Sequence, residues 1–199
     1  MTVAEEPTEE IVDWLNSIDV LGRTVSSLLP EEYDMVVQIS HEESEGSLPP
    51  ELARELTQVL RMHTSTPEDI WLCVWEGWGE WQLFSEARPC APLARGITWF
   101  RNALKARQTQ PRDEPTNRLL IPNREYRVFR GDVDDVAGSF IRGLHHQSAS
   151  MWWPDDRAWF VATEVAAEST FVGCANGCGE QLVASLGNQV EADTLWIGT

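Results

Sequence analysis

Long apolar runs are missing from this chain, since no window approaches the roughly 18 consecutive apolar residues of a membrane-spanning helix. A secretory signal is also missing, because the opening residues MTVAEEPTEE are acidic and polar where a signal is basic and then apolar. No G-x-S-x-G motif, phosphate-binding P-loop or dinucleotide-binding glycine motif occurs. We therefore expect a cytoplasmic protein with reduced thiols, and the easily recognised enzyme classes are excluded.

Basic residues are scarce: 15 face 32 acidic residues, which gives a net charge of -17. Residues 1–70 hold 16 acids and 3 bases, whereas residues 86–130 hold 4 acids and 10 bases. This field repels a nucleic-acid duplex or an anionic membrane, because phosphate binding requires clustered Lys and Arg. The basic interval contains Trp99 and Phe100, a mixture that suits a single nucleic-acid strand, but we expect it to dock on the acidic remainder. The composition predicts a basic protein partner, no nucleic acid and no membrane.

The spacing of apolar residues predicts an α+β fold, with a mixed or antiparallel sheet and helices packed mainly on one side. The expected helices are 8–22, 50–63, 94–107, a helix capped by Asp132, and 179–186; the expected strands are 33–40, 69–75, a hairpin at 118–130, a strand from Arg157, and 169–174. The stretch 69–75 is apolar throughout, which is typical of a central strand covered on both faces.

Two regions are expected along the chain. Residues 1–25 form an amphipathic helix packed on the main domain, and residues 26–199 form a single α+β domain. Within that domain, residues 105–118 contain two prolines, many charges and no apolar period, so we expect a mobile loop there.

The cysteines raise the question of a metal site. Cys174 and Cys178 flank a glycine-containing turn at a spacing that zinc sites allow, but a second pair of comparable spacing is missing. We therefore expect buried or incidental cysteines, no metal and no other cofactor.

Tryptophan is abundant, with 10 residues in 199, and gathers mainly at 71–81 and 152–159. Glycines permit a tight turn after the first group, and Pro154, Asp155 and Asp156 predict a turn within the second. Carboxylates beside indole rings suit a cationic or protein partner, although turn aspartates also satisfy their own backbone amides. The predicted binding residues are Trp75, Trp78, Trp81, Trp152, Trp153, Asp155, Asp156 and Trp159.

Two blocks of sequence resemble a family of uncharacterised actinobacterial proteins. They are Trp75-Glu-Gly-Trp-Gly79 with the preceding strand, and Pro122-Asn-Arg-Glu-Tyr126 followed by Trp152-Trp-Pro-Asp-Asp-Arg-Ala-Trp159 and Thr163-Glu164. The resemblance covers most of the chain from about Leu28 onward and implies no activity. Separately, Leu29-Pro-Glu-Glu-Tyr33 is similar to the Leu-Pro-x-x-Tyr motif of SUKH-type immunity proteins, which are acidic α+β domains that neutralise toxins by protein contact.

These observations favour a non-catalytic interaction protein whose acidic, Trp-rich surface binds a basic protein, as immunity proteins do. One alternative is a hydrolase in an aromatic-lined cleft, with an acid/base pair drawn from Asp155, Asp156, Glu164, His145 and His146. The position of the two histidines at a helix end instead favours contact with the helix dipole. A small-ligand-binding module is the other alternative, and it would require a closed apolar pocket.

Overall fold

The computed structural model describes residues 2–3, 7–18, 28–41, 46–78, 118–121, 124–138, 140, 146–163, 169–187 and 190–191. The α-helices are α1 (Glu9–Leu15), α2 (Pro50–Leu60) and α4 (Asn176–Leu186), and the 3-10 helices are η2 (Arg61–His63), η3 (Glu76–Trp78) and η5 (Val133–Ala137). The strands are β1 (Thr2–Val3), β2 (Met35–Ser40), β3 (Ile70–Trp75), β4 (Arg118–Ile121), β5 (Arg124–Gly131), β6 (Met151–Pro154), β7 (Trp159–Thr163), β8 (Ser169–Cys174) and β9 (Val190–Glu191). The helix expected at 94–107 lies outside these residues, and so does the loop expected at 105–118 except for Arg118, which begins β4.

The described strands form one nine-stranded sheet in which every pairing is antiparallel. The order is β1-β5-β3-β6-β7-β8-β2-β9, and β4 pairs with β5 beside this path. The predicted α+β class is therefore confirmed. β3 lies between β5 and β6 and is buried over all but its last residue, as expected of a strand covered on both faces.

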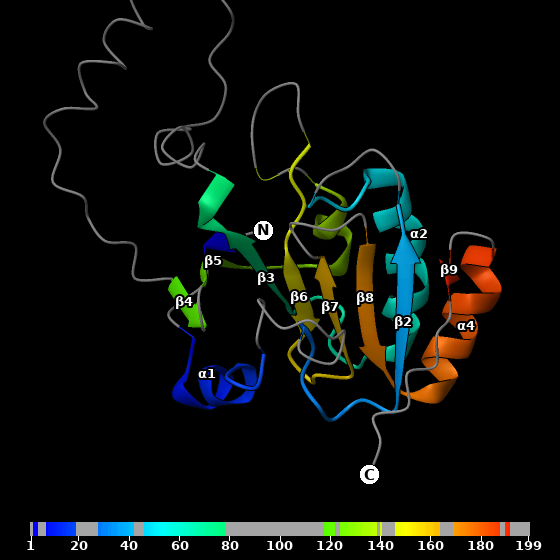
Figure 1. The fold of residues 1–199 in the computed structure, drawn as a ribbon, viewed down its shortest axis with the longest axis horizontal. Helices are drawn as coiled ribbons and strands as arrows, with labels where there is room; N and C mark the ends of the chain where they lie inside the picture. The colour runs from blue at the N-terminus through cyan, green and yellow to red at the C-terminus, as the bar shows by residue number, and fades with distance from the viewer. Residues whose placement is uncertain are drawn as a thin grey trace, which may run out of the picture.

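Helices cover mainly one face of the sheet, as predicted. α2 packs against both α4 and η5, and Figure 1 shows α2 and α4 side by side near β2. The apolar side chains of these helices form a core with one face of the sheet, through residues such as Leu56, Leu182 and Val37. Alternate residues of the strands point to the opposite face, where a second core contains Tyr33 and Phe160.

The second core is closed partly by α1, which lies below β4 in Figure 1. Thr8 caps this helix by accepting from the Ile11 N–H at 3.4 Å, and Ile11 and Leu15 are buried. Arg157 Nη2 pairs with Glu10 at 3.0 Å, and the Arg157 guanidinium lies 4.7 Å from the centre of the Trp14 ring. An ion pair and a cation–π contact thus join α1 to the turn that precedes β7.

Among the described residues, no helix is both long and apolar enough to cross a membrane.

Candidate binding site

Trp152, Trp153 and Trp159 lie in the core, and none is more than 1% exposed. Trp152 and Trp159 meet edge to face on the helix-covered side of the sheet, with ring centroids 5.1 Å apart. Trp153 points to the opposite face and stacks on Trp71. The alternation of the strands therefore sends these indoles into two cores, which corrects the prediction that they contribute to an exposed binding surface.

Asp155 is held by neighbouring donors at the turn between β6 and β7. The carboxylate Oδ1 accepts from Trp71 Nε1 at 3.1 Å and from both Arg130 Nη atoms at 3.0 Å. The Arg130 guanidinium also pairs with Asp69 and lies 3.9 Å from the centre of the Trp71 ring. This carboxylate therefore orders the surface around Trp71 and Arg130, although it is 51% exposed and shares its one arginine with Asp69.

Asp156 connects the same turn to the segment that follows η2. Its carboxylate accepts from Thr64 Oγ1 at 2.8 Å, from the Ser65 N–H and Oγ at 2.7 Å each, and from the Ala158 N–H at 3.2 Å. Partial burial raises the pKa of Asp156, but these hydrogen bonds together outweigh burial and leave the pKa below its ordinary value of 3.8. The geometry indicates a structural role for this residue too.

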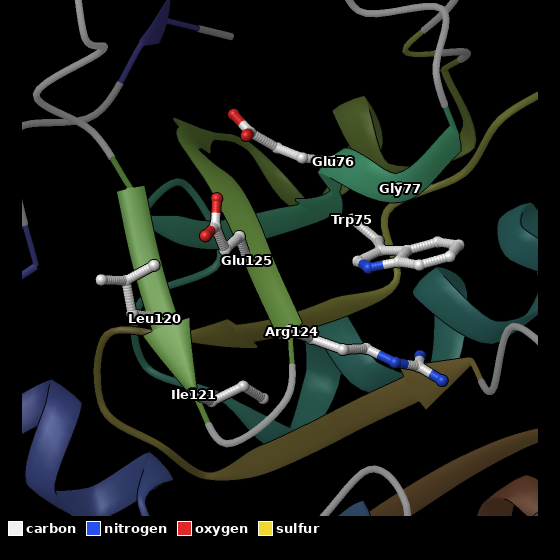
Figure 2. Close-up of a pocket in the computed structure, with 7 residues that line it drawn as sticks. All are labelled: Trp75, Glu76, Gly77, Leu120, Ile121, Arg124 and Glu125. Carbon is white, nitrogen blue, oxygen red and sulfur yellow. The ribbon is translucent and has the colours of Figure 1, made fainter.

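An open pocket of about 530 Å³ lies at the other end of β3, where η3 meets the β4–β5 hairpin (Figure 2). Trp75 is half-buried in this pocket. A Cβ atom on Gly77 would collide with the Trp75 indole, so a glycine at this position allows the ring to lie against η3. The pocket is lined by Trp75, Glu76, Gly77, Leu120, Ile121, Arg124 and Glu125.

The carboxylates of the pocket differ in exposure. Glu76 is 17% exposed, and its two oxygens pair with Arg127 Nε at 2.8 Å and Arg118 Nη2 at 3.2 Å. Glu125 is 56% exposed, and Arg118 Nη1 approaches it only to 3.8 Å. Glu76 is thus fixed by the arginines of the hairpin, whereas Glu125 presents most of its charge to solvent.

The pocket also contains an aromatic and apolar surface. The Arg124 guanidinium lies 5.2 Å from the centre of the Trp75 ring, and Figure 2 shows this side chain extending from the start of β5 toward the indole. Leu120 is 60% exposed although its neighbours Leu119 and Ile121 are buried, because alternate residues of β4 face opposite sides. The cation and the indole therefore lie on one face of the hairpin, whereas the exposed leucine lies on the other face with Glu125.

Two further tryptophans were predicted to bind, Trp78 and Trp81, and the structure describes only the first of them. Trp78 ends η3, and Trp81 lies outside the described residues.

The acid and base residues of the hydrolase alternative that the structure describes, His146, Asp155 and Asp156, do not converge. His146 precedes β6, whereas Asp155 and Asp156 follow it, and a four-residue strand spans about 13 Å. His145 and Glu164 lie outside the described residues. Burial lowers the pKa of His146, but no carboxylate of the turn lies near enough to share its proton.

Of the three described cysteines, two belong to one cluster. Cys174 ends β8, Cys178 lies in the first turn of α4, and both are buried without a disulfide. In the part of the chain that the structure describes, no group of three or more His, Cys, Asp or Glu side chains is arranged to hold a metal ion.

Sequence reasoning located the Trp75 end of the site but missed the residues that the hairpin contributes. The available signal was the run Arg118-Leu-Leu-Ile121, since strand alternation must expose its middle leucine if the flanking residues are buried. Arg124 and Glu125 follow directly on the next strand, so they enter the same area through the hairpin.

No protein-family model, no curated protein and no solved structure matches this chain.

Proposed function

We propose that this chain is a non-catalytic interaction domain that binds an extended, basic segment of another protein at the pocket between η3 and the β4–β5 hairpin. The observation that carries the proposal is an open pocket whose lining includes both the exposed Leu120 and the half-buried Trp75. Apolar surface of this kind, with an aromatic anchor, is typical of the centre of a protein interface.

The charge of the chain favours a basic partner. The net charge is -17, which attracts a cationic segment over long range and accelerates its encounter. Within the pocket, Glu125 provides a solvent-facing carboxylate for a lysine or arginine of that segment. A basic toxin, of the kind bound by the immunity proteins that residues 29–33 resemble, is one partner with this chemistry.

The position of the pocket favours an extended segment. Among the described strands, β4 pairs only with β5, so no described strand occupies its other edge, where a partner strand can add. A segment added along β4 would place every second side chain on the face that carries Leu120 and Glu125. Basic side chains on that face would pair with Glu125 and pack their methylene groups on Leu120, and the alternate apolar side chains would lie on the face that carries Trp75.

The test uses amide and indole NMR spectra of the full chain titrated with three acetylated hexapeptides: alternating Lys and Leu, alternating Lys and Ser, and alternating Glu and Leu. The Lys/Leu peptide is expected to shift the Trp75 indole and the β4 amides, with weaker effects from the other two. Leu120→Asp is expected to weaken this binding about tenfold, because it removes the apolar contact. Met62→Asp is the matched control, since Met62 is 62% exposed and lies on η2.

A second pair of variants separates local contact from the overall field. Glu125→Lys and Glu51→Lys change the net charge equally, but only Glu125 lines the pocket. We expect Glu125→Lys alone to weaken binding of the Lys/Leu peptide substantially. Equal effects of the two reversals, or wild-type binding by Leu120→Asp, would refute the proposed site.

The pocket volume also favours a second candidate, a small-ligand-binding module, because about 530 Å³ lies within the range of ligand sites. The same spectra distinguish the two candidates. A small indole-stacking cation such as arginine amide would then bind at Trp75 as strongly as the hexapeptide, without shifting the β4 amides.

A further inference from the structure

Two cysteines lie together where β8 leads into α4, on the helix-covered face and apart from the pocket. Cys174 is fully buried and Cys178 is 2% exposed, and both belong to the same hydrophobic cluster. Each thiol shifts the pKa of the other, and neither forms a disulfide. Because Cys174 ends β8 and Cys178 lies in the first turn of the helix that follows, a bond between them would close a short loop within one buried cluster.

The two thiols differ in acidity because they occupy different positions in one hydrogen bond. The Cys174 thiol donates to the Cys178 sulfur and thereby lowers the pKa of Cys178, which also lies at the amino-terminal turn of α4. The same hydrogen bond, together with burial, raises the pKa of Cys174. Cys178 therefore ionises first, and the thiolate is the form that attacks a disulfide.

The first turn of α4 lacks several of the interactions that usually stabilise a helix start, so we expect it to open easily. Its N-cap is Ala175, which forms no side-chain cap hydrogen bond, and no acidic residue lies in the first turn. Gly177 adds backbone freedom within that turn, and a Cβ atom there would meet nothing within 4 Å. Residues 175–177 are exposed, so fraying of this turn gives solvent access to Cys178 without unfolding the sheet.

We propose that Cys174 and Cys178 are a redox-active dithiol that a small-molecule disulfide, such as glutathione disulfide, oxidises to an intramolecular disulfide. The Cys178 thiolate attacks one sulfur of the oxidant, which forms a mixed disulfide and releases one thiolate. Cys174 loses its proton to solvent, and its sulfur then attacks the Cys178 sulfur and displaces the second thiolate. The two cysteines are oxidised by two electrons together, and the oxidant is reduced to two thiols.

The test treats the folded full chain carrying Cys90→Ser with glutathione disulfide and maps its cysteines by mass spectrometry. We expect a Cys174–Cys178 disulfide with no glutathione retained, while Cys73 stays reduced. Cys73 is the internal reference, because it is buried in the other core and burial raises its pKa. Cys174→Ser is expected to retain one glutathione on Cys178, and Cys178→Ser to acquire glutathione at least about tenfold more slowly.

A further variant tests the opening step. Gly177→Ala strengthens the first turn of α4 and is expected to slow oxidation about threefold without changing the product. Circular dichroism of each serine variant verifies folding, and the peptide map of the Cys90→Ser chain decides the matter alone if a serine variant unfolds. Absence of the Cys174–Cys178 disulfide after equilibration, or oxidation of Cys73 at the same rate, would overturn the proposal.

Discussion

Asp156 is expected to stabilise the fold rather than to bind a partner. Its substitution should therefore lower the free energy of unfolding. Asp156→Ala deletes an acceptor of four hydrogen bonds, two from backbone N–H groups and two from hydroxyl groups. The site is exposed, so water competes for these donors and each bond contributes about 0.5 kcal/mol, the low end of the usual range. The expected loss is about 2 kcal/mol, which corresponds to about 4–8 °C in Tm for a chain of this size.

The stabilisation by Asp156 depends on pH in a direction that its pKa sets. The pKa of the folded state lies below the ordinary value of 3.8, so the contribution is fully present above that value and is lost as pH falls through the folded pKa. Asp156→Asn keeps one acceptor oxygen and is expected to cost less than Asp156→Ala at neutral pH. The difference between wild type and either variant should shrink below about pH 4.

Urea unfolding at a series of pH values, followed by circular dichroism, measures these differences. Asp13→Asn is the control, because Asp13 is exposed on α1 and the substitution changes the net charge equally. Wild-type stability of Asp156→Ala at pH 7, or a loss that stays constant down to pH 2, would refute the structural assignment.

Two further predictions concern the cores. Trp159→Phe leaves the Leu60 carbonyl without its indole donor and is expected to cost about 2–3 kcal/mol in urea unfolding, whereas an unchanged midpoint would mean that the hydrogen bond at 3.0 Å contributes nothing. Gly173→Ala brings a Cβ atom to 2.6 Å from the Tyr33 ring and is expected to lower the free energy of unfolding by about 1–3 kcal/mol. Gly177→Ala, at an open helix position, is expected to raise it by up to about 1 kcal/mol. Thermal unfolding of the two variants tests whether the close approach at Gly173 is real.

Much of the fold could be predicted because local signals agree with the tertiary structure. Thr8 marked the start of α1, the proline pair marked the start of α2, and the wholly apolar stretch at 69–75 marked a strand covered on both faces. The order of the strands could not be predicted, because the insertion of β2 between β8 and β9 depends on contacts between distant parts of the chain. The sequence pattern specifies which face of a strand is apolar, but not which strand lies beside it.

The binding site was predicted less well, for a reason that Trp152 and Trp153 illustrate. Adjacent tryptophans suggest an exposed patch, since one of two neighbours on a strand usually faces solvent. Here helices cover one face of the sheet, and α1 with the segment around Tyr33 covers the other, so both indoles are buried. Asp155 was likewise predicted as a binding carboxylate, but Arg130 reaches it from the next-but-one strand, a contact that sequence spacing does not reveal.

The place of β2 in the sheet has a consequence for folding. β2 is made early in synthesis, but its described pairings are with β8 and β9, and its Gln38 side chain bonds Ser169, 131 residues later in the chain. Until β8 is synthesised, the apolar side chains and the unpaired backbone groups of β2 are exposed to other chains. Closing so long a loop makes the docking of β2 slow, so refolding is expected to be limited by this step and to compete with aggregation as concentration rises.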